Sequence, residues 1–236
     1  EKFLDTIKTQ AKIVDNIYFA GGEPLMHPEH YEILQELDSL DKLDKIDFMY
    51  STNLTNLYYK NHCVIDYLKK MKKCKLVVSI DEVDPDRLHY IRYPSNLNDI
   101  VGNIKELNTV LRSVEKHWSI VPTWNVLNLH RMKDIVGYFK DNELLPYAFY
   151  ISVSWEMDMH NIILMHPEHL SISSAPPEWK KYLHTTLNEF EEWYKDVMIP
   201  MKSPNVKFFA TKILEGNMNK FRNALDETNT EKSLEY

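Results

Sequence analysis

Strand-like and helix-like segments alternate along most of this chain of 236 residues, and the alternation limits the folds it can adopt. Short apolar runs rich in β-branched and aromatic residues predict buried strands, and segments of about 10–15 residues with helical spacing separate them. Strands joined through helices in this way run parallel, with right-handed crossovers. We therefore expect an α/β fold in which the carboxyl ends of the strands meet at one edge.

The predicted strands are followed by polar motifs, and the pattern changes in the last third of the chain. Strands are predicted at residues 17–20, 45–51, 74–81, 117–125, 147–155 and 158–164, and helices at about 28–40, 61–73, 96–111 and 130–141. Turn formers follow, and then two long helices at about 178–198 and 206–225. The chain is therefore divided into an α/β core, residues 1–164, and a mainly helical extension, residues 165–236.

An adjacent pair of glycines, Gly21 and Gly22, stands before Glu23 and Pro24, although the whole chain has only five glycines. The pair follows the first predicted strand and precedes a helix that begins near Pro28, so it lies in a strand-to-helix turn. Glycine adopts a positive φ readily and lets other groups approach the backbone. Because ligands of α/β folds bind at the carboxyl ends of strands, the turn is a candidate ligand contact. A tight turn that needs only a positive φ is the alternative.

Composition excludes several classes of function. The net charge of −7 argues against a general nucleic-acid binder, which carries a basic face. No apolar run reaches the length of a membrane span, and no signal-peptide pattern opens the chain, so we expect a cytoplasmic protein without a membrane partner. Cys63 and Cys74, the only cysteines, form neither a disulfide framework nor a CxxC motif. We interpret both as packing residues, with Cys63 in a helix and Cys74 just before a strand.

The hexapeptide LMHPEH occurs twice, at residues 25–30 and 164–169. Each copy contains an HxxH pair with a proline inside it, at the start of a predicted helix or turn. A catalytic zinc site needs three protein ligands, and no third ligand is identified for either pair. We interpret these histidines as helix-entry residues and assign no metal site.

Four motifs at the ends of predicted strands share an order that resembles one enzyme family. They are FAGGEP, STN, VSID followed by YIRYPSN, and TWNVLNL. In this order and spacing they resemble the radical S-adenosylmethionine (SAM) enzymes. The segments PEHLSI…PPEWKK and FRNALDETNTEKSLEY look like the members that carry a twitch domain after the core. The resemblance implies a partial, TIM-like (β/α)6 barrel of parallel strands, followed by a twitch-like extension.

The resemblance also implies a SAM-binding site. Its residues come from the ends of four predicted strands: Gly21, Gly22, Glu23, Pro24, Ser51, Asn53, Ser79, Asp81, Arg92 and Asn125. The double-glycine turn would meet the amino group of the methionine end of SAM, because unobstructed carbonyls and a nearby carboxylate suit a cation. Asn125 would lie near the adenosine end.

The other implied contacts surround the same ligand. Ser51 and Asn53 would line the cavity, and Ser79 and Asp81 would hydrogen-bond the ribose or the carboxylate of SAM. Arg92 would pair with that carboxylate, which fits its bidentate fork. Each side chain taken alone also has a structural alternative, since polar residues at strand ends cap turns and form surface ion pairs. The shared order of the motifs favours the ligand interpretation.

The chain lacks the CxxxCxxC loop that holds a four-iron four-sulfur (4Fe-4S) cluster in the family. It opens inside a segment that resembles the helix leading into GGEP, so we expect the first strand and the cluster ligands upstream of Glu1. On its own the chain is then expected to make no radical.

The implied function is that of a radical SAM oxidoreductase. The cluster would reduce SAM, and the resulting 5′-deoxyadenosyl radical would take hydrogen from a small-molecule or peptide substrate, with electrons from a flavodoxin- or ferredoxin-type donor. A SAM-binding or interaction module without a cluster is the first alternative. The second is an unrelated βα-barrel enzyme that uses Glu23 and Asp81 for acid–base chemistry. It would need a glycine-rich phosphate loop near the last strands, where only Gly137 occurs.

Overall fold

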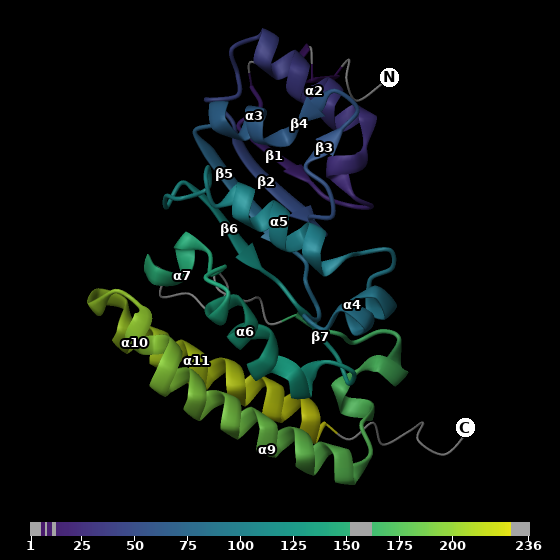
Figure 1. Ribbon diagram of the computed structural model, residues 1–236, viewed down its shortest axis with the longest axis vertical. Helices are drawn as coiled ribbons and strands as arrows, with labels where there is room; N and C mark the ends of the chain where they lie inside the picture. Colours follow the sequence, from purple (N-terminus) through teal and green to yellow (C-terminus); the bar gives the residue numbers. More distant parts are fainter. Residues whose placement is uncertain (1–5, 8, 11–12, 152–161, 228–236) are drawn as a thin grey trace.

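A parallel sheet of four strands forms the upper part of the molecule in the computed structural model, which describes residues 6–7, 9–10, 13–151 and 162–227 (Figure 1). The strands are β1 (Asn16–Phe19), β2 (Asp47–Thr52), β5 (Lys73–Val78) and β6 (Lys116–Ile120). They lie in the sheet in the order in which they occur in the chain, and every neighbouring pair is parallel. The predicted α/β class with parallel strands is thus confirmed.

Helices connect successive strands, and sequence features account for where they begin. They are α2 (Pro28–Ser39), α3 (Val64–Lys70), α4 (Pro85–Ile91), α5 (Leu97–Leu107) and α6 (Met132–Asp141). Pro28 occupies the first turn of α2, where its missing N–H is no loss. Asp84 caps α4 by accepting hydrogen bonds from two backbone N–H groups, and Asn96 caps α5 in the same way with one.

The two faces of the sheet differ, because side chains alternate along each strand. Phe48 and Tyr50 of β2 are buried, together with Leu76 and Val78 of β5, in one continuous core. Full burial of such a side chain contributes about 1.5–3 kcal/mol. Residues of the opposite parity are more accessible, for example Met49 of β2.

Two small sheets and a helical layer complete the fold. The pair β3 (Tyr58–Tyr59) and β4 (His62–Cys63) is antiparallel, whereas β7 (Thr123–Trp124) and β8 (Ile162–Ile163) are parallel. Four 3₁₀ turns occur in the described part: η1 (Pro24–Met26), η2 (Leu129–Arg131), η3 (Glu168–Leu170) and η4 (Ile172–Ser174).

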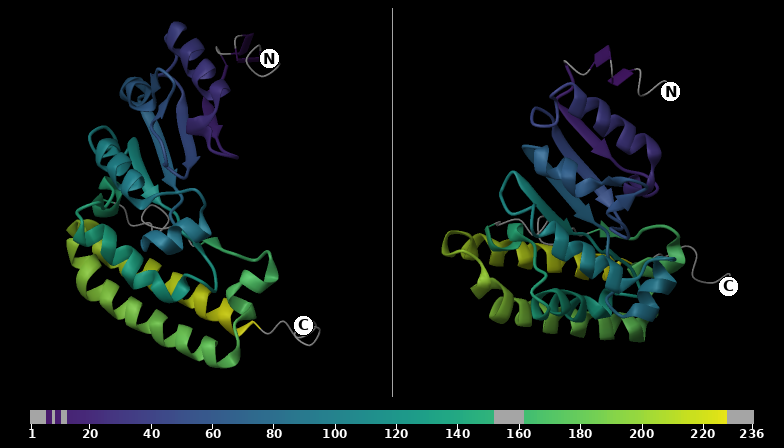
Figure 2. Two further views of the ribbon diagram at one scale, coloured as in Figure 1. Left: turned by 45° about the vertical axis from the view of Figure 1, so that its right-hand side comes forward. Right: turned by 45° about the horizontal axis from the view of Figure 1, so that its top comes forward.

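The C-terminal part is helical, as predicted. Its long helices are α9 (Pro177–Trp193), which continues as a π-helical turn over Tyr194–Met198, and α11 (Pro204–Asp226), with the short α10 (Ile199–Met201) between them. Figure 2 shows α9 and α11 side by side along the lower edge of the molecule, with α6 between α9 and the sheet. Leu183 and Leu187 of α9 and Leu214 of α11 are buried at this interface.

The predicted strand at residues 147–155 is wrong in its described part. Residues Tyr147–Ile151 form helix α7, and residues 152–155 lie outside the described residues. The run YAFYI is too short for its periodicity to separate a strand from a helix. Pro146 directly before it suits a helix start, and the Phe149 N–H donates to the Pro146 carbonyl at 3.0 Å. Of the segment predicted at 158–164, residues 158–161 also lie outside the described residues.

Two further boundaries differ from the prediction. The helix expected at 61–73 begins at Val64, because His62 and Cys63 pair with β3 in a hairpin, so Cys63 is not helical. The single strand expected at 117–125 is interrupted at Pro122, which cannot donate a ladder hydrogen bond, and therefore becomes β6 and β7. Cys74 lies within β5 rather than before it.

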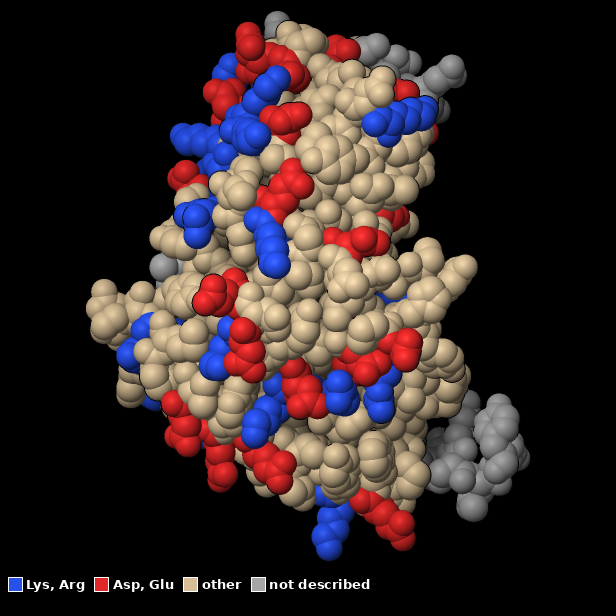
Figure 3. Space-filling model, viewed as in Figure 1, with Lys and Arg blue, Asp and Glu red and all other residues tan. Residues whose placement is uncertain are grey.

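Two further observations concern the distribution of charge on the surface and the length and hydrophobicity of the helices. On the face shown in Figure 3, acidic and basic side chains are interspersed rather than gathered into a basic patch. Among the described residues, no helix is long and apolar enough to cross a membrane.

Candidate functional site

The turn after β1 is tied to the end of β2 through the carboxylate of Glu23. Its Oε1 accepts hydrogen bonds from the Thr52 hydroxyl at 2.5 Å and the Leu25 N–H at 3.3 Å. Its Oε2 accepts one from the Asn53 N–H at 2.6 Å. Parallel strands end at the same edge, which is why residues about thirty positions apart meet here. The bonds hold the turn and leave part of the acceptor capacity of Oε2 unused.

A second set of contacts runs from the end of β2 to the end of β5. The Arg92 guanidinium donates from Nη1 to the Asn53 side-chain oxygen at 2.7 Å and from Nε to Asp81 Oδ2 at 2.5 Å. Asp81 is 4% exposed, whereas the Arg92 side chain retains 22% exposure. Among the described residues, no hydrogen bond from Arg92 Nη2 is found, so part of the donor capacity of this partly exposed guanidinium is unused.

A third set reaches the segment after β6. The Thr123 N–H donates to Asp81 Oδ1 at 2.6 Å. The Asn128 amide donates to the Asp81 carbonyl at 3.0 Å and to the Thr123 carbonyl at 3.1 Å. The Asn125 side chain closes its own loop, since it donates to the Thr123 carbonyl and accepts from the Leu127 N–H. The ends of β2, β5 and β6 therefore share one hydrogen-bonded network with the Glu23 turn.

Glu82, the neighbour of Asp81, takes part in a separate ion pair. It is fully buried, and its carboxylate accepts from the Val83 N–H at 2.8 Å and from Arg131 Nε at 3.2 Å. The contact with Glu82 raises the pKa of Arg131 above its usual value. Arg131 also donates to Asp134 on α6. This pair connects β5 to the helical layer rather than to the Glu23 turn.

The two glycines of the turn have different requirements. Gly21 has φ +93°, a conformation that L side chains rarely adopt, so the backbone itself requires glycine there. Gly22 has no such φ, and a Cβ added to it would meet nothing within 4 Å. The fold therefore explains Gly21 and does not explain Gly22.

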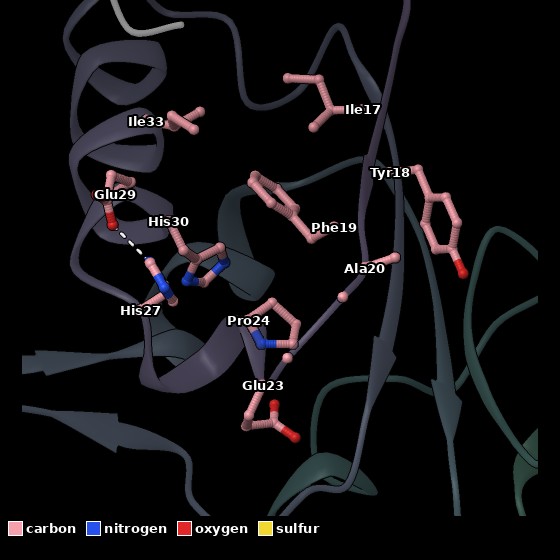
Figure 4. Close-up of a pocket in the computed structure, with 12 residues that line it drawn as sticks. Ile17, Tyr18, Phe19, Ala20, Glu23, Pro24, His27, Glu29, His30 and Ile33 are labelled. Carbon is pink, nitrogen blue, oxygen red and sulfur yellow. Dashed lines mark hydrogen bonds and ion pairs between the residues drawn. The ribbon is translucent and has the colours of Figure 1, made fainter. Parts of the chain in front are cut away.

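A cavity of about 320 Å³ adjoins the turn on the α2 side of β1. Its lining is mainly apolar and includes Phe19, Pro24 and Ile33 (Figure 4). Figure 4 shows the Glu23 carboxylate pointing away from Phe19 and His30. The lining also includes Gly21, Gly22 and Glu23, so the cavity and the polar network meet at the turn.

His30 lies at the inner wall of this cavity and is buried. Its Nε2 is 3.2 Å from the Tyr50 hydroxyl, while its Nδ1 has no hydrogen-bond partner. Burial lowers the pKa of His30 to about 3, so the imidazole is neutral at pH 7. His27 at the rim pairs with Glu29 on α2.

The cysteines do not form a metal centre with each other. Cys74 is buried in β5, and burial raises the pKa of its thiol to about 12. Cys63 packs partly buried in the β3–β4 hairpin. In the described part of the chain, no group of three histidine, cysteine or acidic side chains could hold a metal ion. The described residues therefore do not fit an iron–sulfur cluster, which needs several thiolate ligands.

Comparison with models of known protein families identifies the family of this chain. The family model described as "Radical SAM superfamily" matches residues 1–138, more than half of the chain. The chain belongs to the radical SAM superfamily. No curated protein matches it significantly.

Solved structures give more distant likenesses to this radical SAM chain. Streptococcus suis SuiB bound to S-adenosylmethionine is 18% identical over 60% of this chain and 30% of that chain, with a TM-score of 0.42. SuiB bound to its precursor peptide SuiA is 14% identical over 80% of this chain and 39% of that chain, with a TM-score of 0.46. The radical SAM chain thus spans well under half the length of SuiB.

The structure brings most of the predicted site residues to one edge of the radical SAM core. Glu23, Asn53, Asp81 and Arg92 are joined by the contacts above, and Gly21 and Gly22 are exposed beside them. Ser51 and Ser79 are half-buried on the more accessible face of the sheet. Pro24 is buried at the start of η1, and the Asn125 side chain is engaged in its own loop. Their roles toward SAM remain predictions.

Sequence reasoning assigned no ligand role to three residues of this hydrogen-bonded network: Thr52, Thr123 and Asn128. Thr52 stands inside the STN motif, between two residues that were selected. Asn128 stands inside TWNVLNL, three residues after the selected Asn125. A polar side chain predicted at a buried position next to a strand end is the signal that could have identified both.

Proposed function

We propose that this radical SAM chain binds SAM at the edge where β1, β2 and β5 end. The residues proposed as contacts are those that the motifs indicate: Gly21, Gly22, Glu23, Pro24, Ser51, Asn53, Ser79, Asp81, Arg92 and Asn125. The observation that carries the proposal is the strand-end edge itself, where the exposed Gly21–Gly22 turn adjoins Glu23, and Glu23 and Arg92 both bond to Asn53. No atom lies within 4 Å of a Cβ added at Gly22, so the backbone there is open to a ligand.

The charged groups at this edge suit the methionine end of SAM. Glu23 retains acceptor capacity on Oε2, which favours an ammonium group. Arg92 donates to Asp81 and Asn53 and keeps unused N–H donors on a partly exposed guanidinium, which favours a carboxylate. The opposite charges of these two side chains match the two charges of an amino acid.

SAM bound beside a reduced 4Fe-4S cluster would supply a 5′-deoxyadenosyl radical that abstracts hydrogen from a substrate. The contribution of this chain is to hold and orient SAM. Because its described residues do not fit a cluster, we assign none of them a role in electron transfer. A small-molecule or peptide substrate and a flavodoxin- or ferredoxin-type donor complete the proposed oxidoreductase.

The test uses the two glycines as a matched pair, with SAM titrated into the full-length protein by calorimetry. Gly22→Ala should leave the melting temperature unchanged and weaken SAM binding at least tenfold, because the new Cβ meets only the ligand. Gly21→Ala should instead lower the free energy of unfolding by about 1–2 kcal/mol, the cost of a side chain at positive φ. Unchanged SAM affinity in Gly22→Ala, or no SAM binding by the unaltered protein, would contradict the proposal.

A further inference from the structure

Asn128 is a fully buried polar residue whose hydrogen-bonding groups are all engaged with backbone. Its side-chain oxygen accepts from the Asn125 N–H at 2.8 Å. Its amide donates to the carbonyls of Asp81 at 3.0 Å and Thr123 at 3.1 Å. One carboxamide therefore joins the segment that follows β5 to the segment that follows β6.

The two segments that Asn128 joins are also the ones that hold the Asp81 carboxylate. Its Oδ1 accepts from the Thr123 N–H at 2.6 Å, and its Oδ2 accepts from Arg92 Nε at 2.5 Å. A shift of either segment would change the distance from Thr123 to Asp81 and hence the direction in which the carboxylate points. The orientation of Arg92 depends on that direction.

We propose that Asn128 is a positioning residue that fixes the Asp81–Arg92 pair. Because Asn128 is fully buried, we assign it no direct contact with the ligand. The effect of Asn128 on SAM affinity rests on the proposed function, whereas its effect on the geometry of the Asp81–Arg92 pair does not.

The chemistry of the carboxamide explains why asparagine fits this position. Two backbone carbonyls need donors and one N–H needs an acceptor, and only a carboxamide of this length offers both. An aspartate would set a carboxylate oxygen against two carbonyl oxygens. Alanine or leucine would leave the Asp81 carbonyl and the Asn125 N–H unpaired, and each unpaired group is costly; the Thr123 carbonyl would keep its bond from the Asn125 side chain.

The first experiment is a double-mutant cycle on SAM affinity in the full-length protein, with Asn128→Ala, Arg92→Ala and the double variant. If Asn128 acts through Arg92, Asn128→Ala weakens SAM binding about tenfold, and adding it to Arg92→Ala weakens binding by less than about twofold more. Full additivity of the two changes would overturn the proposal.

The matched control is Asn108→Ala. Asn108 accepts a hydrogen bond from the Trp118 indole at 2.8 Å, away from the Asp81–Arg92 pair. This variant should lose stability as Asn128→Ala does and keep its SAM affinity. An equal loss of SAM affinity in both variants would show that destabilisation alone explains the effect, and would overturn the proposal.

Hydrogen exchange at the Thr123 amide tests the positioning without SAM. Asn128→Ala should speed exchange at Thr123 at least tenfold while Ser79, whose N–H donates to the Thr52 carbonyl, changes little. Unchanged protection of Thr123 would overturn the proposal. If the unaltered protein binds no SAM, the proposed function fails while this measurement still decides the role of Asn128.

Discussion

Two adjacent carboxylates, Asp81 and Glu82, form ion pairs that are similarly buried but connect to different parts of the molecule. Asp81 is 4% exposed and pairs with Arg92, and Glu82 is 0% exposed and pairs with Arg131. The two arginine side chains are exposed to similar extents, 22% and 24%. Yet the Arg92 pair joins the network of the Glu23 turn, whereas the Arg131 pair faces α6.

The difference lies in the groups that each carboxylate contacts. Asp81 accepts hydrogen bonds from Arg92 and the Thr123 N–H, whereas Glu82 accepts them from Arg131 and the Val83 N–H. Arg131 lines a separate hollow of about 510 Å³ with Asp134 and Trp193. A buried arginine–carboxylate pair is thus no sign of a ligand site by itself. The groups that surround the pair have to be considered as well.

The largest expected effect is on stability, and it distinguishes the Glu82–Arg131 ion pair from the Asp81–Arg92 ion pair. Arg131→Ala leaves the fully buried Glu82 without its cation, so the free energy of unfolding should fall by about 3–5 kcal/mol. SAM affinity of the folded protein should stay within about twofold of the original, since Arg131 is outside the network. Urea denaturation and calorimetry measure the two quantities. If SAM affinity falls by more than the loss of folded protein accounts for, the Arg131 pair also affects SAM binding and the distinction between the two pairs is wrong.

Outside the two pairs, His30 should make the stability of the fold sensitive to acid. Its folded pKa of about 3 lies below the unfolded value of about 6.5, so the unfolded state binds more protons below pH 6.5. The contribution of His30 is therefore fully present above pH 6.5 and is lost as the pH falls toward about 3. At pH 4.5 the loss should reach about 3 kcal/mol.

His30→Gln removes this titration and can keep a hydrogen bond to Tyr50. Urea denaturation at pH 7 and pH 4.5 should show a decrease smaller by about 3 kcal/mol in this variant than in the original protein. Parallel decreases in the two proteins would assign the acid sensitivity to other groups, and the ion pairs would be the next to test.

The smallest expected effect is on SAM affinity, and it tests whether the forked shape of the Arg92 guanidinium matters. Arg92→Lys keeps the charge and loses the fork that reaches Asp81 and Asn53 together, so SAM affinity should fall about tenfold, or about 1.4 kcal/mol. Arg131→Lys is the matched control, and SAM affinity should not change. Equal affinities for the two lysine variants, measured by calorimetry, would mean that the Arg92 fork does not face the ligand.

Much of the fold was predictable because it depends on local pattern. The run Ile17–Phe19, the glycine pair and the helical spacing after Pro28 each carry their own signal. The prediction failed at Tyr147–Ile151, where five apolar residues suit a strand as well as a helix and tertiary packing made the choice. It also missed that Pro122 divides one strand-like segment into two.

The sequence alone determined the family-bearing motifs, their order along parallel strands and the residues expected at the strand ends, because spacing and residue type are properties of the chain itself. It selected Asp81 rather than Glu82 only through the family resemblance, and it could not find the parts played by Thr52 and Asn128. Those roles depend on hydrogen bonds between segments about thirty to fifty positions apart, which exist only once the parallel strands place their ends side by side.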